Sequence, residues 1–283
     1  MTSEKWIERG EARLYTEALG DPADPPILLI MGVMASKLWW PEEFCTRLAE
    51  SGHFVIRYDN RDTGLSTHCP QGLPNYSFAD MADDAVAILD GYGIDKAHIA
   101  GVSMGGMLAQ QVALRYPNRV RTASFISTSP VGVKDLPPST EAYRAHSAEG
   151  EAVDWTDLAA MEAYIAKDCA MIAGTRHPHN AEAVADLIAR DMKRSHDFRS
   201  VTNHFMLLGD PDGPELKAAD IKAPVLAIHG TSDPLFPVQH GEAFASVGPG
   251  ARLVRIDGGG HEIHPGDIDE IVGAITRHTA GRV

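Results

Sequence analysis

Six short apolar runs recur along the chain and limit its possible folds more than any other feature. They lack the alternation of apolar and polar residues expected of a strand with one solvent-exposed face. They therefore predict strands buried on both faces, as in a parallel sheet. A seventh segment, KWIERGEARLYTEALG, predicts a hairpin that turns near Arg9 and Gly10. The six runs are ILLIMG (27–32), FVIRYD (54–59), AHIAGVS (97–103), TASFIST (122–128), VLAIHG (225–230) and ARLVRID (251–257).

Helical patterns lie between these runs. The segment PEEFCTRLAESG begins with Pro and ends with Gly, the expected polarity of helix signals. A second segment, SFADMADDAVAILDGYG, opens with Ser77 as a candidate N-cap, and a third, LAQQVALRYP, stops before Pro117. Alternating strands and helices predict an α/β fold, and 283 residues suffice for one large core.

The alternation stops once, between about Val131 and Ile221. This stretch has helical periodicity, as in WTDLAAMEAYIAKDCAMIAG and NAEAVADLIARDMKRS, and it contains no convincing buried strand. We therefore expect a core domain made of residues 1–130 and 222–283, with residues 131–221 inserted as a helical cap, or lid.

Charge and cysteine content limit the partners. The chain has 25 Lys and Arg against 39 Asp and Glu, a net charge of −14, which argues against nucleic acid and against an anionic membrane surface. Its three cysteines show no CxxC pair and no disulfide framework, which favours a reducing compartment. No window is apolar enough for a membrane span, so we expect a cytoplasmic protein. The sequence leaves the oligomeric state open.

Ser103 stands in GVSMGG, between a predicted strand and a predicted helix. The pattern G-x-S-x-G in this context is typical of a nucleophile elbow, in which a sharp turn presents the serine and small neighbours avoid collisions. A serine needs a base to take its proton. His261, just past the last predicted strand in DGGGHEIHP, is our candidate base, and His264 is its competitor.

The acid that orients this histidine should follow a strand. Asp233, three residues beyond VLAIHG, is our candidate, and Asp257 at the end of the next strand is the alternative. An oxyanion hole needs two backbone N–H groups. We assign these to Met104 and Val33, with Met34 as the fallback for Val33. We expect no metal, because the histidine spacing lacks the HExxH pattern and HPH at 177–179 lies in a polar segment.

These residues resemble the α/β-hydrolase superfamily. The resemblance rests on IMGVMAS, GVSMGG, HGTSDPLFP and GGGHEIH. It implies a mostly parallel eight-stranded sheet flanked by helices, with the cap inserted between strands 6 and 7. The chain departs from many members at Met31, where they have His before Gly. The serine excludes the dehalogenase and epoxide-hydrolase chemistry of relatives that use Asp as nucleophile.

Within the superfamily, VIRYDNRDTGLS and the long helical insertion resemble the methylesterases of polyketide antibiotic pathways, such as those of the aclacinomycin methylesterase type. We interpret the charged residues of this motif, Asp59, Arg61 and Asp62, as scaffold.

Together these features predict a serine hydrolase that cleaves a carboxylic ester of a small hydrophobic molecule through an acyl-enzyme, without a cofactor. A C–C bond hydrolase or lactonase with the same triad is the alternative, and a ligand receptor or pseudoenzyme of the same fold is a further one. Five apolar residues are predicted to contact the substrate: Met34, Trp39, Phe205, Leu235 and Phe236.

Overall fold

The computed structural model describes residues 2–208, 216–247 and 250–281. They contain an eight-stranded sheet in the order β1-β2-β4-β3-β5-β6-β7-β8. Its strands are β1 (Thr2–Arg9), β2 (Ala12–Leu19), β3 (Pro26–Ile30), β4 (Phe54–Tyr58), β5 (Ala97–Val102), β6 (Val120–Ile126), β7 (Val225–Gly230) and β8 (Arg252–Ile256). The six apolar runs are β3 to β8, and they are parallel to one another.

The predicted hairpin is β1 and β2. Arg9 pairs with Ala12 across the turn, and Gly10 has φ +58°, a conformation that favours glycine. β2 pairs with β4 in antiparallel register, so the hairpin extends the parallel sheet at one side.

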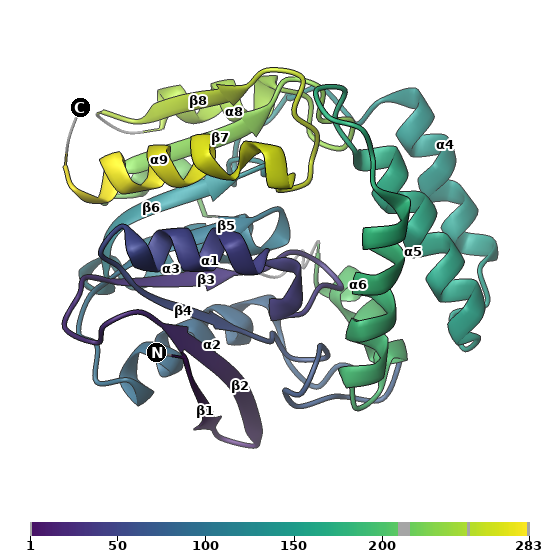
Figure 1. The fold of residues 1–283 in the computed structure, drawn as a ribbon, viewed down its shortest axis with the longest axis horizontal. Helices are drawn as coiled ribbons and strands as arrows, with labels where there is room; N and C mark the ends of the chain where they lie inside the picture. Colours follow the sequence, from purple (N-terminus) through teal and green to yellow (C-terminus); the bar gives the residue numbers. More distant parts are fainter. Residues whose placement is uncertain (1, 209–215, 248–249, 282–283) are drawn as a thin grey trace.

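Helices cover both faces of the sheet (Figure 1). α1 (Glu42–Glu50) and α9 (Ile268–Thr279) lie on one face, and α2 (Phe78–Gly91) and α3 (Met104–Arg115) lie on the other. The short α8 (Gln239–Ala243) follows β7. Ser77 caps α2 as expected, in a capping box with Asp80.

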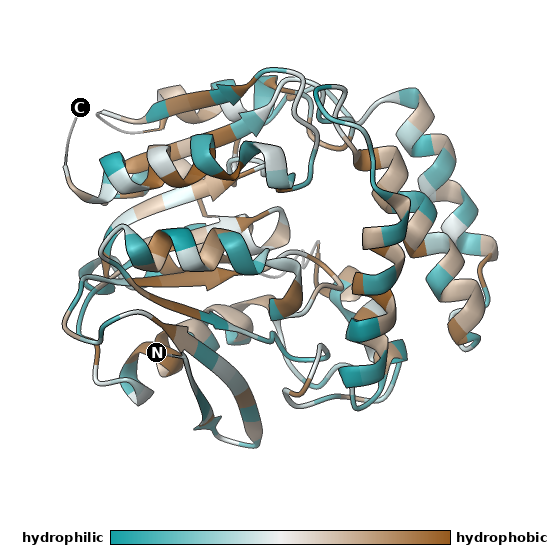
Figure 2. Ribbon diagram, in the orientation of Figure 1, coloured by the Kyte–Doolittle hydropathy of each residue, from teal (hydrophilic) through white to brown (hydrophobic). Residues whose placement is uncertain are grey.

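Each face has its own apolar core, and the strands between them are mostly hydrophobic (Figure 2). On one face, Phe44 and Leu48 of α1 pack with Ile275 of α9. On the other, Leu89 of α2 packs with Val112 of α3. Burial on both faces explains why the strand sequences do not alternate.

Between β6 and β7 the described residues form helices and no strand. These are α4 (Glu141–Glu149), α5 (Leu158–Ile172), α6 (Ala181–Arg194) and α7 (Asn203–Leu207). The predicted helical segments correspond to α5 and α6. Figure 1 shows α4, α5 and α6 beyond one end of the sheet. This is the end at which the parallel strands reach their carboxyl termini, so the loops after β3, β5, β7 and β8 lie on the side of the sheet that faces the insertion.

Candidate active site

Ser103 lies between β5 and α3 in a strained backbone conformation. Its φ of 54° and ψ of −120° are sparsely populated by residues with a side chain. The neighbouring glycines allow the turn: a Cβ on Gly101 would lie 2.1 Å from the Gly105 carbonyl oxygen, and one on Gly105 would lie 2.1 Å from that of Ile30. The strand, the turn and the helix therefore pack more closely than any larger residue would permit.

The Ser103 side chain faces the loop that follows β3. A Cβ built on Gly32 would lie 3.4 Å from Ser103 Cβ and 4.0 Å from its Oγ, so the glycine keeps the space beside the hydroxyl open. Ser103 is 7% exposed. Its hydroxyl makes no hydrogen bond to any other residue that the structure describes. The positive end of the α3 dipole lies next to it.

His261 and Asp233 form a buried pair. Nδ1 of His261 lies 2.8 Å from Oδ2 of Asp233, and the two side chains come from the loops after β8 and β7. The other carboxylate oxygen, Oδ1, accepts the N–H groups of Leu235 and Phe236, each at 2.9 Å. Since a carboxylate only accepts, we assign the proton to Nδ1, which leaves Nε2 of His261 as a free acceptor.

The electrostatic environment of this pair favours the ionised form of the Asp233 carboxyl. Burial raises the pKa of Asp233, but His261, His229 at 3.4 Å and the Phe236 N–H together lower it more, so the pKa of the carboxyl is below its usual value. An ionised Asp233 would stabilise a positive charge on the adjacent imidazole.

The two competitors have other partners. His264 accepts the N–H of Gly266 at 3.0 Å, and its ring stacks on His177 with a centroid separation of 4.4 Å. Asp257 accepts the Thr231 hydroxyl at 3.3 Å. The geometry therefore brings Asp233 and His261 together and directs His264 and Asp257 elsewhere.

One group of three possible metal ligands occurs among the described residues: His177, His264 and Asp267. Nε2 of His177 is already 2.8 Å from Asp267, and Arg176 lies 3.2 Å from the same carboxylate. The two imidazole rings are within 9° of parallel and stacked. A cation cannot lie in both ring planes at once, so this arrangement suits a packing contact better than a metal.

The loop after β3 contains both candidates for the second oxyanion donor. The N–H of Met34 donates to Nδ1 of His204 at 3.1 Å and is occupied. The N–H of Val33 makes no hydrogen bond to another described residue, nor does that of Met104, which as the first residue of α3 has no partner within the helix. The geometry thus favours Val33 and Met104 over Met34. Sequence reasoning missed His204, which lies 170 positions from Met34 with no motif around it.

The five residues predicted to contact substrate lie in different settings. The ring of Phe236 is 5.6 Å from that of His261, and Leu235 is in the same loop. Met34 packs against an apolar cluster of the insertion that includes Met161 and Phe198. Trp39 donates its indole N–H to Asp191 of α6 at 2.8 Å. Phe205 is 50% exposed on α7 and makes no ring contact with His261 or with any other residue that the structure describes.

The insertion touches the loops of the site directly. The Ile172 carbonyl at the end of α5 accepts the N–H of His261 at 2.9 Å, and the N–H of Thr140 donates to Pro234 at 2.8 Å. On its other side Arg194 of α6 forms two hydrogen bonds with Asp59, at 3.0 and 2.6 Å. These contacts place the insertion over the carboxyl ends of the strands.

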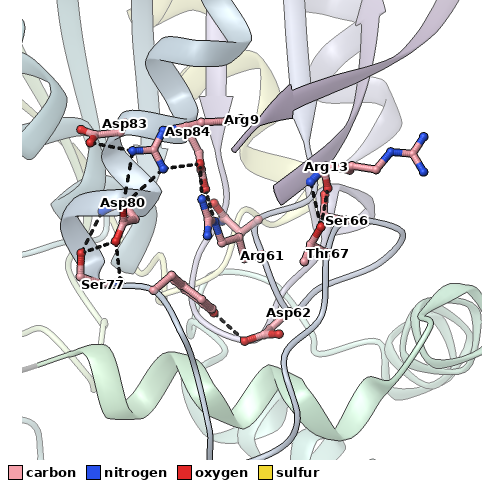
Figure 3. A network of polar contacts seen from close by, with 12 residues as sticks. Arg9, Arg13, Arg61, Asp62, Ser66, Thr67, Ser77, Asp80, Asp83 and Asp84 are labelled. Carbon is pink, nitrogen blue, oxygen red and sulfur yellow. Dashed lines mark hydrogen bonds and ion pairs between the residues drawn. The ribbon is translucent and has the colours of Figure 1, made fainter. Parts of the chain in front are cut away.

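The charged motif after β4 makes scaffold contacts. Arg61 binds Asp84 through two hydrogen bonds of 2.7 and 2.8 Å, and Asp62 accepts the Tyr76 hydroxyl at 2.6 Å. Figure 3 shows this network, in which Arg9 of β1 also contacts Asp84 of α2. These contacts agree with the interpretation of the motif as scaffold.

Comparison with known proteins identifies the family. A model of the alpha/beta hydrolase fold matches residues 25–267. The chain belongs to the α/β-hydrolase family. The predicted family and fold are therefore confirmed, and in the described part of this hydrolase no helix is long and apolar enough to cross a bilayer.

Two curated relatives and one solved structure refine the likeness. The hydrolase is 33% identical to rhodomycin D methylesterase DnrP of Streptomyces peucetius and 32% identical to DauP, the same enzyme of Streptomyces sp. (strain C5), with 97% of each chain covered. This confirms the resemblance to polyketide methylesterases. The esterase EaEST from Exiguobacterium antarcticum superposes with a TM-score of 0.79 at 18% identity, covering 98% of this chain and all of the other.

Proposed function

We propose that this hydrolase cleaves a carboxylic ester of a hydrophobic small molecule with Ser103 as nucleophile, His261 as base and Asp233 as orienting acid. The observation that carries the proposal is the buried Asp233–His261 pair, which lies at the same end of the sheet as the strained turn bearing Ser103. The likeness to two methylesterases supports a methyl ester of a bulky acid as the substrate class.

The proposed cycle assigns one role to each of these residues. His261 Nε2 takes the Ser103 proton while Oγ attacks the ester carbonyl carbon, and the N–H groups of Val33 and Met104 bind the resulting oxyanion. The tetrahedral intermediate then breaks its bond to the alkoxy group, which leaves as an alcohol with the proton from His261. A water molecule, deprotonated by the same nitrogen, releases the acid and restores Ser103. The residues described require no cofactor for these steps.

The insertion, residues 131–221, is proposed to act as a lid that selects the substrate. Its contacts with Pro234, His261 and Asp59 support this proposal, because they join the insertion to the loops of the candidate site. Phe236, beside His261, and Met34, against the insertion, are proposed to contact the acyl group together with Trp39 and Leu235. Phe205 is proposed to contact bulky substrates from α7, and comparing Phe205→Ala with Phe236→Ala on short and bulky esters tests the two positions separately.

Replacing the nucleophile tests the proposal. Ser103→Ala should lower kcat for p-nitrophenyl esters at least about a thousandfold, because the substitution removes the nucleophile. The far-ultraviolet circular dichroism spectrum should stay unchanged, because no packing contact of the core is removed. A panel of methyl esters, lactones and β-diketones then separates ester hydrolysis from lactone opening and C–C bond cleavage. A residual rate above a tenth of wild type would remove Ser103 from the mechanism.

A further inference from the structure

His204 of α7 links the insertion to two backbone groups of the core. Its Nδ1 lies 3.1 Å from the nitrogen of Met34, and its Nε2 lies 2.8 Å from the carbonyl oxygen of Arg61. A carbonyl oxygen only accepts, so Nε2 carries the proton. Nδ1 then has a lone pair that accepts the Met34 N–H.

The surroundings of His204 maintain this tautomer. The side chain is completely buried, and burial lowers its pKa although the Arg61 carbonyl and Asp62 oppose the shift. The imidazole is therefore neutral near pH 7. A protonated ring would have no acceptor for Met34, whereas the neutral ring satisfies both backbone groups.

Met34 needs such a partner because its backbone is strained. Its φ of 62° lies in the left-handed region, which is unfavourable for a residue with a side chain. The hydrogen bond to His204 and the packing of the Met34 side chain against Met161 and Phe198 hold this conformation. Fixing the peptide of Met34 restricts the orientation of Val33, the residue before it.

We infer that His204 is a positioning residue for the oxyanion hole: it holds Met34 so that the N–H of Val33 faces Ser103. This inference rests on the proposed function. A Cβ built on Gly32, the residue before Val33, would lie 3.4 Å from Ser103 Cβ, so this part of the loop runs beside the serine. Since the acceptor comes from the insertion, the oxyanion hole is complete only while α7 stays docked on the core.

Two near-isosteric variants separate the two hydrogen bonds of His204. In His204→Asn the amide oxygen takes the place of Nδ1 and can still accept from Met34. In His204→Gln the amide N–H takes the place of Nε2 and can still donate to Arg61, but the Met34 N–H loses its acceptor. The measurements are kcat and KM for one p-nitrophenyl ester and the inhibition constant of a boronic acid, which forms a tetrahedral adduct with a nucleophilic serine.

His204→Gln should lower kcat about 10- to 100-fold with KM within about twofold of wild type, because a misplaced oxyanion donor acts on the transition state. Its boronic acid inhibition constant should rise by a similar factor, and its urea midpoint should match that of His204→Asn. His204→Asn should keep kcat within about fivefold of wild type. A purely structural anchor would instead give equal losses of kcat in both variants, in step with their stability.

Normal kcat in His204→Gln, together with an inactive Ser103→Ala, would overturn this inference and leave the proposed function standing. An active Ser103→Ala would instead overturn the proposed function. If His204→Gln does not fold, nitrogen NMR of the wild-type boronic acid adduct decides the question. The inference requires that Nδ1 of His204 carries no proton and shows NMR coupling to the Met34 amide across their hydrogen bond. A protonated Nδ1, or one without this coupling, would overturn the inference.

Discussion

At the scale of single residues, the proposed mechanism depends on the contact between Asp233 and His261. Asp233 selects the tautomer of His261 whose free nitrogen can take a proton. Asp233→Asn should therefore lower kcat about a hundredfold or more, because an amide that donates to Nδ1 favours the wrong tautomer. Steady-state kinetics with a p-nitrophenyl ester measure this effect. Asp257→Asn is the matched control and should stay within about threefold of wild type, and a reversed order would transfer the role to Asp257.

Asp233 and His261 could be chosen as candidates from the sequence because each lies three to five residues beyond the end of a strand. Strand ends are easy to locate in runs such as VLAIHG, and the parallel order brings their loops together. His204 could not be predicted in this way, because its partner Met34 is distant in sequence and the contact depends on how the insertion docks. The sequence already favours Val33 over Met34 as an oxyanion donor, and the contact with His204 adds structural support for that choice.

At the scale of elements, the elbow depends on the absence of side chains at its glycines. A Cβ on Gly105 would meet the Ile30 carbonyl, which is backbone and cannot turn away. Gly105→Ala should lower the free energy of unfolding by about 2–4 kcal/mol, as overpacking does. Gly273→Ala on α9 is the control, since its Cβ would meet only the flexible end of Arg277, and it should stabilise by about 0.5–1 kcal/mol.

Urea titrations of the two variants at pH 7 measure these changes. Equal effects at Gly105 and Gly273 would contradict the account of close packing between β5, α3 and the end of β3.

The alternation of strands and helices makes these elements predictable from the sequence. Of the insertion, only α5 and α6 were predicted, since the apolar stripes of α4 and α7 are short and their positions depend on contacts with the core.

At the scale of the whole molecule, buried neutral histidines make stability depend on pH. Burial lowers the pKa of His98 to about 4, with smaller contributions from nearby His53, Arg121 and His278. An unfolded histidine binds its proton near pH 6.5, so between pH 6.5 and 4 the unfolded state binds more protons than the folded state. The stabilisation is complete above pH 6.5 and is lost as the pH falls through this window.

Between pH 6.5 and 4, the free energy of unfolding should fall by roughly 3 kcal/mol because of His98. Unfolding free energies measured by urea at pH 7, 6, 5 and 4.5 should fall steadily in wild type. In His98→Gln, which keeps a polar group near Thr122, the decline should be shallower, whereas His196→Gln at an exposed site should follow wild type. Parallel curves for all three proteins would contradict the role of His98.

The central claim is that Ser103 forms a covalent acyl intermediate with the help of His261. A fluorophosphonate tests it most directly, because the activated serine displaces fluoride and forms a stable bond to phosphorus. Peptide mapping by mass spectrometry should find one adduct, on the peptide that contains Ser103, and labelling should be at least about a hundredfold slower in His261→Ala but nearly unchanged in His264→Ala. An active enzyme that stays unlabelled at Ser103, or that carries the adduct on another residue, would contradict the account.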